Sequence, residues 1–149
     1  YKRQTLDTSG NPFTREGERF EKIRKLLEVT DLVMLDIKHI DDEQHKILTG
    51  QTNRNILDMA RYLDEIGKPM WIRHVLVPER SDKDEYLIRL DAFIQSLHNV
   101  EKVEVLPYHT LGAYKWKELG YEYPLEGIDP PTQERIKNAN QLLHTGARV

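Results

Sequence analysis

Charged and polar side chains stand at the ends of the apolar runs in this 149-residue sequence. Asp36 and Lys38 close one run, and Asp7 and His109 follow two others. Arg73 lies inside an apolar run, where a charge must be paired or must face a polar cavity. If these five side chains converge on one place, they form a site for an anionic or zwitterionic small molecule.

Each of these residues also has an ordinary structural interpretation when it is taken singly. Asp7 or Asp36 could cap a turn or a helix, and Lys38 could extend its amine into solvent. His109, which follows a Pro-Tyr pair, could be a structural histidine with satisfied hydrogen bonds. The recurrence of such residues at every apolar run favours a common site over five separate coincidences.

The elements that would position these residues are short strands that alternate with helices. Runs rich in β-formers predict strands at residues 4–8, 32–37, 70–77 and 103–106. Between them, apolar residues repeat with helical spacing; they are Phe20, Ile23, Leu26, Leu27, Ile56, Ala60, Leu63, Leu87, Leu90, Ile94 and Leu97. Strands separated by helices of this length form parallel βα units. The predicted fold class is therefore α/β with a parallel sheet.

Local signals predict several helix ends. Asn53 and Ser81 have the side chains of N-caps, and a last helix is expected from about residue 132 to residue 146. The acidic residues 41–43 are interpreted as a helix start rather than a metal site, because the histidines show no metal-binding spacing.

Strand periodicity divides the side chains between two faces of the predicted sheet. Asp36 and Lys38 share one face with Met34, and Arg73 shares a face with Val75. Ligands of parallel α/β folds bind at the carboxyl ends of the strands, so this end of the sheet is the predicted site.

The composition excludes several other classes of protein. A formal net charge of −3, with basic and acidic residues interleaved, argues against nucleic acid as a partner. No run of apolar residues is long enough to span a membrane, so we expect a cytoplasmic protein. The sequence has no cysteine, so it offers no thiolate to an iron–sulfur cluster.

Four stretches, in their order along the chain, closely resemble the pyruvate formate-lyase activating enzymes, a radical S-adenosylmethionine family. They are residues 6–10 (LDTSG), 30–38 (TDLVMLDIK), 71–78 (WIRHVLVP) and 103–112 (VEVLPYHTLG). The resemblance implies a partial β/α barrel of six units, of which this chain supplies about four. We expect residues 1–149 to form a single domain, the C-terminal portion of that barrel, with the N-terminal cluster-binding portion absent.

The resemblance also implies an activity. In the family, a reduced [4Fe-4S] cluster cleaves S-adenosylmethionine, and the resulting 5′-deoxyadenosyl radical takes a hydrogen atom from a glycine Cα of pyruvate formate-lyase. The implied electron donor is a protein such as flavodoxin or ferredoxin. The family's C-x-x-x-C-x-x-C loop and Gly-Gly-Glu motif are missing here. We therefore expect an enzyme fragment that is inactive alone, that contains no catalytic residue and whose cluster ligands lie upstream.

The resemblance assigns binding roles residue by residue. The positions that match contacts with S-adenosylmethionine are Lys38, Arg73, Val75 and His109, and those that match a monovalent-cation site are Asp7, Thr8, Asp36 and the backbone carbonyl of Met34. Two alternatives stay open. One is a non-catalytic small-molecule-binding module without a cluster, and the other is a barrel hydrolase or aldolase that uses Lys38 as a Schiff-base lysine.

Overall fold

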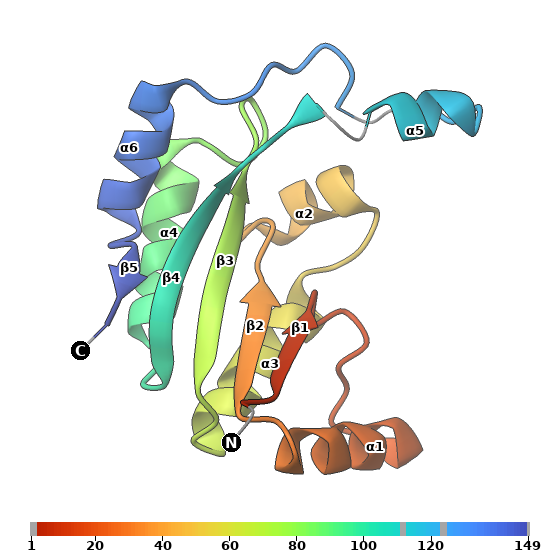
Figure 1. Ribbon diagram of the computed structural model, residues 1–149, viewed down its shortest axis with the longest axis vertical. Coiled ribbons are helices and arrows are strands. Elements are labelled where there is room, and N and C mark those ends of the chain that lie inside the picture. Colours follow the sequence, from red (N-terminus) through yellow and green to blue (C-terminus); the bar gives the residue numbers. More distant parts are fainter. Residues whose placement is uncertain (1–2, 111–112, 123–124, 149) are drawn as a thin grey trace.

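The computed structural model describes residues 3–110, 113–122 and 125–148. Within them a sheet runs in the order β1-β2-β3-β4-β5 (Figure 1). Its strands are β1 (Thr5–Thr8), β2 (Leu32–Asp36), β3 (Met70–Leu76), β4 (Val100–Pro107) and β5 (Gly146–Ala147). The first four strands are parallel, and β5 pairs antiparallel with β4. The four predicted strands and the α/β class are confirmed, whereas the sequence analysis missed β5.

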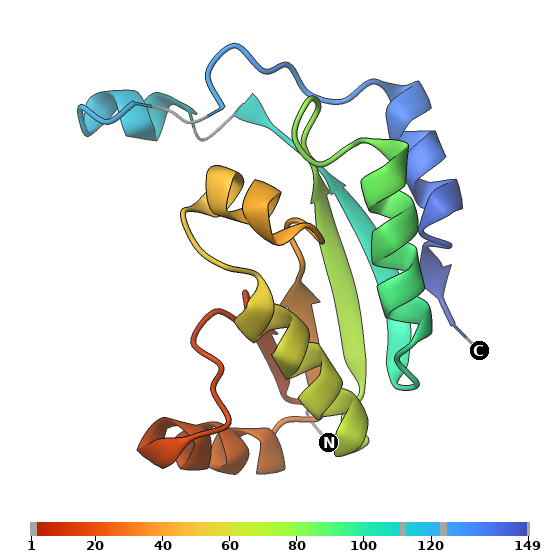
Figure 2. The same cartoon turned by 180° about the vertical axis from the view of Figure 1, so that it is seen from behind.

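Helices cover only one face of the sheet (Figures 1 and 2). They are α1 (Gly17–Glu28), α2 (Asp42–Thr49), α3 (Arg54–Glu65), α4 (Asp84–Gln95) and α6 (Gln133–Leu142). The short helix α5 (Ala113–Glu118) projects beyond the end of β4 and covers neither face. The core lies between the sheet and this layer; its members include Val33, Leu35, Ile72, Ala60, Leu63, Leu90 and Ile94. We call the opposite face, which no described helix covers, the open face. No helix among the described residues is long and apolar enough to cross a membrane.

Burial along the strands follows the alternation expected for a sheet covered on one face. In β3 the side chains of Ile72 and His74 are buried against the helices, while Arg73 and Val75 are only partly buried. The periodicity argument that placed Arg73 and Val75 on one face therefore agrees with the structure.

The predicted cap at Ser81 is wrong, because α4 begins at Asp84. Ser81 is buried instead, and its hydroxyl donates to the Val75 carbonyl at 2.9 Å and accepts from the Val77 amide at 3.0 Å. Asn53 does occupy the N-cap position of α3, but its side chain makes no capping hydrogen bond. Both side chains therefore bind backbone groups outside the helix whose start they were predicted to cap.

The acidic residues 41–43 do start a helix, since the Asp41 side chain accepts from the Gln44 amide at 3.0 Å as the N-cap of α2. The last helix is correctly predicted at its start but not at its end. It stops at Leu142, and His144 has a left-handed backbone with φ of 49°. That conformation breaks the helix and turns the chain toward β5.

Candidate functional site

An arginine and two carboxylates form the centre of the open face, on three neighbouring strands. Arg73 of β3 lies opposite Asp36 of β2 in the register, and its Nε donates to Asp36 Oδ1 at 2.7 Å. Its Nη2 donates to Asp7 Oδ1 on β1, so the guanidinium reaches across β2. Burial acts to lower the pKa of Arg73, but the hydrogen bonds to Asp36 and Asp7 outweigh it and raise that pKa. The expectation that Arg73 must be paired is confirmed.

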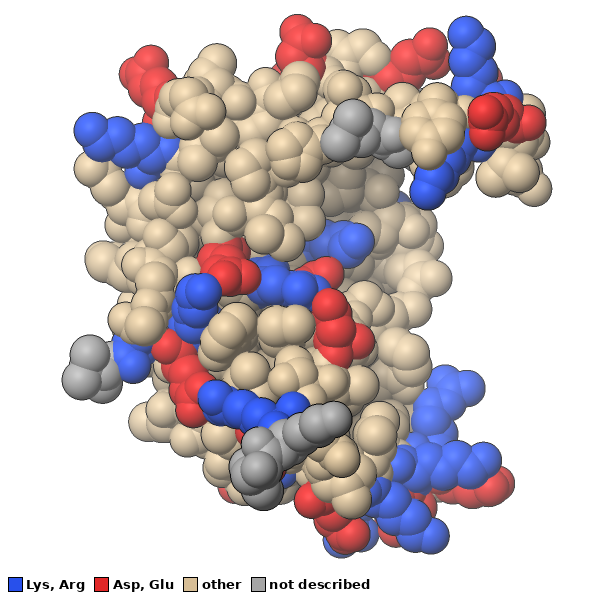
Figure 3. All heavy atoms as spheres, viewed as in Figure 1, with Lys and Arg blue, Asp and Glu red and all other residues tan. Residues whose placement is uncertain are grey.

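A second ion pair continues this row of charges on β4. Lys102 Nζ lies 2.6 Å from Glu104 Oε1, and it also lies 4.7 Å from the centre of the Trp71 ring. Glu104 is the register partner of Arg73. Figure 3 shows the resulting belt of acidic and basic groups across the middle of the open face. The belt is internally paired, so it presents little net charge.

Lys38 differs from these residues because it makes no hydrogen bond or ion pair with any other residue that the structure describes. It is partly buried just past the end of β2. Its side chain lines a cavity of about 580 Å³ whose other walls are Val75, Val77, Tyr108, Trp116, Leu125 and residues 46–50 of α2. An unpaired cation beside a largely apolar chamber favours a ligand with one anionic end and one apolar end.

Lys38 also lines a smaller cavity of about 220 Å³, between the turn after β1 and helix α2. The other lining residues are Ser9, Asn11, His45, Thr49, Gln51 and Ile56. The lysine therefore stands between the two cavities, at the carboxyl ends of β1 and β2.

The remaining predicted site residues are not all gathered there. His109 is exposed and lines neither cavity. The Thr8 hydroxyl accepts from the Gly10 amide at 3.0 Å, so it is engaged in the turn after β1. Met34 pairs with Asp7 in the register, next to the ion pairs. Thus the structure brings together the two aspartates with Arg73, and Lys38 with Val75.

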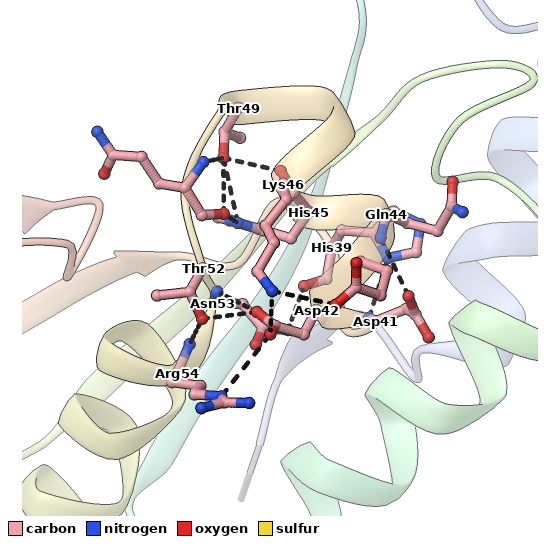
Figure 4. Close-up of polar contacts among 12 residues, drawn as sticks. His39, Asp41, Asp42, Gln44, His45, Lys46, Thr49, Thr52, Asn53 and Arg54 are labelled. Atoms are coloured by element: carbon pink, nitrogen blue, oxygen red, sulfur yellow. Dashed lines mark hydrogen bonds and ion pairs between the residues drawn. The ribbon is translucent and has the colours of Figure 1, made fainter.

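The segment that carries Lys38 is fixed by buried Asn53, which the sequence analysis assigned only to helix capping (Figure 4). Asn53 Nδ2 donates to the carbonyls of His39 at 3.1 Å and Ile40 at 2.8 Å. Asp42 secures the same turn, because its Oδ1 accepts from the Thr52 hydroxyl at 2.6 Å and the Asn53 amide at 2.9 Å. These two hydrogen bonds hold the pKa of Asp42 at about 2.

Two buried histidines fasten the same segment from the helix side. His74 Nδ1 donates to the Ile37 carbonyl at 2.7 Å, and His39 Nε2 donates to the Arg80 carbonyl at 3.0 Å while its Nδ1 accepts from the Asp41 amide. Strand alternation could have identified His74, because it places that residue on the face opposite Arg73, against the helices.

Acidification should destabilise the fold through these histidines. Burial lowers the pKa of both His39 and His74 in the folded chain, whereas an unfolded histidine titrates near about 6.5. The unfolded state then binds more protons at acidic pH. The free energy of unfolding is therefore highest above that pH and falls as the pH drops through it. Melting temperatures between pH 7.5 and pH 5 should show this decline, above the range where carboxylates titrate.

Two variants test the assignment. His74→Asn keeps a side-chain N–H and should flatten the decline of melting temperature with pH. His109→Gln, which changes an exposed side chain, should keep the wild-type slope. An unchanged slope in both His74→Asn and His39→Asn would show that other groups set the pH dependence.

Among the described residues there is no group of three or more histidine and acidic side chains that could hold a metal ion. The polar groups that this face offers a ligand, among the residues described, are thus the Lys38 amine, the Arg73 guanidinium already bound to two carboxylates, and the polar side chains that line the smaller cavity.

Comparison with known proteins identifies the family to which these features belong. The model of the radical SAM superfamily matches residues 2–90. The pyruvate formate-lyase-activating enzyme of Streptococcus mutans is 56% identical over 141 residues, which are 95% of this chain and 54% of that protein. The protein of the same name from Listeria monocytogenes is 52% identical over 143 residues, 96% of this chain and 58% of that protein. The chain thus spans about half the length of the curated relatives it matches.

Two solved structures share the fold. A domain of pyruvate-formate lyase-activating enzyme from Bacteroides vulgatus superposes with a TM-score of 0.74 at 20% identity, covering 95% of this chain and 75% of that one. A radical SAM methyltransferase from Sphaerobacter thermophilus gives a TM-score of 0.63 at 18% identity and covers 94% of this chain and 37% of that one. The family model covers more than half of the sequence. Lys38 and its two cavities lie at the carboxyl ends of the parallel strands, where such folds bind ligands. The chain therefore belongs to the radical SAM superfamily.

Proposed function

We propose that this chain binds S-adenosylmethionine as the C-terminal portion of an activating enzyme that installs a glycyl radical on pyruvate formate-lyase. The names and the 52–56% identity of the relatives support this choice. The single observation that carries it is the amine of Lys38, which pairs with no other described residue and lines a chamber whose walls are largely apolar. The partners of the whole enzyme would be pyruvate formate-lyase and an electron donor such as flavodoxin or ferredoxin, in the cytoplasm.

The donor set fits S-adenosylmethionine, which has a charged amino-acid end and an aromatic base. Lys38 would bind the carboxylate, because an unpaired ammonium gains most from a charge-assisted hydrogen bond. Val75, Val77 and Tyr108 would contact the base and exclude water from it. Arg73 and His109 are proposed to reach the cofactor from the edge of this chamber. When bound together with a reduced cluster, the cofactor supplies the radical that the reaction needs.

A cluster does not fit the residues of this chain, because its 149 residues include no cysteine. Its ligands are therefore proposed to lie in another part of the whole enzyme.

A monovalent cation at Asp7, Thr8, Met34 and Asp36 is also a proposal. These residues do not form a ready site, since Arg73 holds both carboxylates and the Thr8 hydroxyl is bonded to the Gly10 amide.

Removal of the Lys38 amine should weaken cofactor binding. Within the whole enzyme proposed here, Lys38→Ala should weaken the binding free energy of S-adenosylmethionine by about 1 to 3 kcal/mol, the scale of one charge-assisted contact. Isothermal titration calorimetry measures this directly. The control is Lys22→Ala, which removes a 74% exposed lysine paired with Glu18 on α1 and should leave the affinity unchanged. Unchanged affinity for Lys38→Ala, together with a lower melting temperature, would contradict the proposed cofactor site.

A further inference from the structure

The two carboxylates on the open face already have a cation between them, and that cation belongs to the protein. Arg73 binds Asp36 through Nε and Asp7 through Nη2, so one guanidinium serves carboxylates on two different strands. The side chain of Arg73 is 15% exposed and that of Asp36 is 22% exposed, whereas that of Asp7 is 58% exposed. The inner part of this bridge is thus shielded from solvent, where ion pairs are screened least.

A small cation that binds Asp36 Oδ1 and Asp7 Oδ1 would have to lie where the guanidinium lies. Asp36 Oδ1 on β2 and Asp7 Oδ1 on the neighbouring strand β1 both accept hydrogen bonds from Arg73. An alkali ion at this point would compete for the same two oxygens and would be repelled by the arginine at short range. Cation and guanidinium therefore exclude each other.

From these observations we infer that Arg73 is a built-in counter-ion of Asp7 and Asp36, which a monovalent cation replaces only when the guanidinium leaves the two carboxylates. An anionic ligand that draws Arg73 toward itself would then open the position for the cation, so ligand and cation would bind cooperatively. This cooperative step rests on the proposed cofactor function. The exclusion between Arg73 and a cation depends only on the ion pairs.

The exclusion can be tested on this chain by thermal unfolding at constant ionic strength, in potassium chloride and in choline chloride. The wild-type melting temperature should be the same in both salts. Arg73→Gln removes the guanidinium charge and should make potassium stabilising, with a saturable rise of several degrees over choline, because an ion that binds only the folded state raises its stability. The double variant Arg73→Gln with Asp36→Asn has only one of the carboxylates and should lose most of that rise.

Each outcome decides the inference. It is overturned if the wild type responds to potassium as Arg73→Gln does, or if Arg73→Gln shows no difference between the salts. If Arg73→Gln is unfolded in choline chloride, its circular dichroism should recover as potassium is added, and failure to recover overturns the inference as well. Thallium-205 resonance, which reports a bound monovalent ion directly, should detect binding to Arg73→Gln and none to the wild type. No arm contains S-adenosylmethionine, so the result is independent of whether that cofactor binds.

Discussion

Replacement of Gly10 by alanine should destabilise the fold by about 2 to 5 kcal/mol, the combined scale of a left-handed backbone penalty and an overpacked contact. Gly10 has a φ of 70°, and an added Cβ would lie 2.9 Å from Leu35 Cδ1 and 3.2 Å from Ile56 Cα. The leucine methyl can rotate away, but the backbone of α3 cannot move without disturbing the core. The turn after β1, which carries Ser9 at the smaller cavity, is therefore pressed against α3.

A matched variant separates the two contributions. Gly17 has a φ of 72°, and an added Cβ there would meet nothing within 4 Å. Gly17→Ala should therefore cost only the backbone penalty, about 1 to 2 kcal/mol. Urea unfolding followed by circular dichroism gives both values. Equal losses in the two variants would mean that the close approach at Gly10 is relieved at no cost.

Asn53→Ala should also have a large effect, a loss of about 2 to 3 kcal/mol in the free energy of unfolding. The substitution leaves the carbonyls of His39 and Ile40 without their donor in a buried place, and each unsatisfied group of this kind is costly. Asn53→Asp should be at least as damaging, because a carboxylate cannot donate to a carbonyl. Chemical unfolding of the two variants measures both losses.

Asn55, which lies two residues after Asn53 in the first turn of α3, provides the control for this prediction. Its Nδ2 donates to the Asn11 carbonyl at 3.2 Å, but the contact is exposed. Asn55→Ala should change stability by less than about 0.5 kcal/mol, as is usual for surface substitutions. If Asn53→Ala and Asn55→Ala prove equally mild, the turn after β2 is held by the Asp42 contacts instead of by Asn53.

The face of the candidate site could be predicted because strand alternation is a local property. Met34, Asp36 and Lys38 follow the period of two, and Arg73 could be expected to need a partner because it interrupts an apolar run. The identity of that partner could not be predicted. It depends on which strands lie side by side and in what register, and the second carboxylate comes from β1, two strands away.

The contacts that escaped prediction are made by short polar residues that precede a helix but bind backbone groups outside it. Ser81 and Asn53 both look like helix caps in sequence, since capping needs only a short polar side chain before a helix. In the fold, Ser81 binds the backbone of β3 instead, and Asn53 binds the turn after β2. Strand β5 is only two residues long and begins with glycine, so it gives no periodic signal.

The order of the strands in the sheet has a consequence for how the chain acquires its structure. Each described strand after β1 pairs with the strand that precedes it along the chain. Every new strand therefore finds its partner already synthesised, and each loop that must close contains only one βα unit, which keeps the entropy of closure small. Such a chain can assemble vectorially, strand by strand, as it leaves the ribosome.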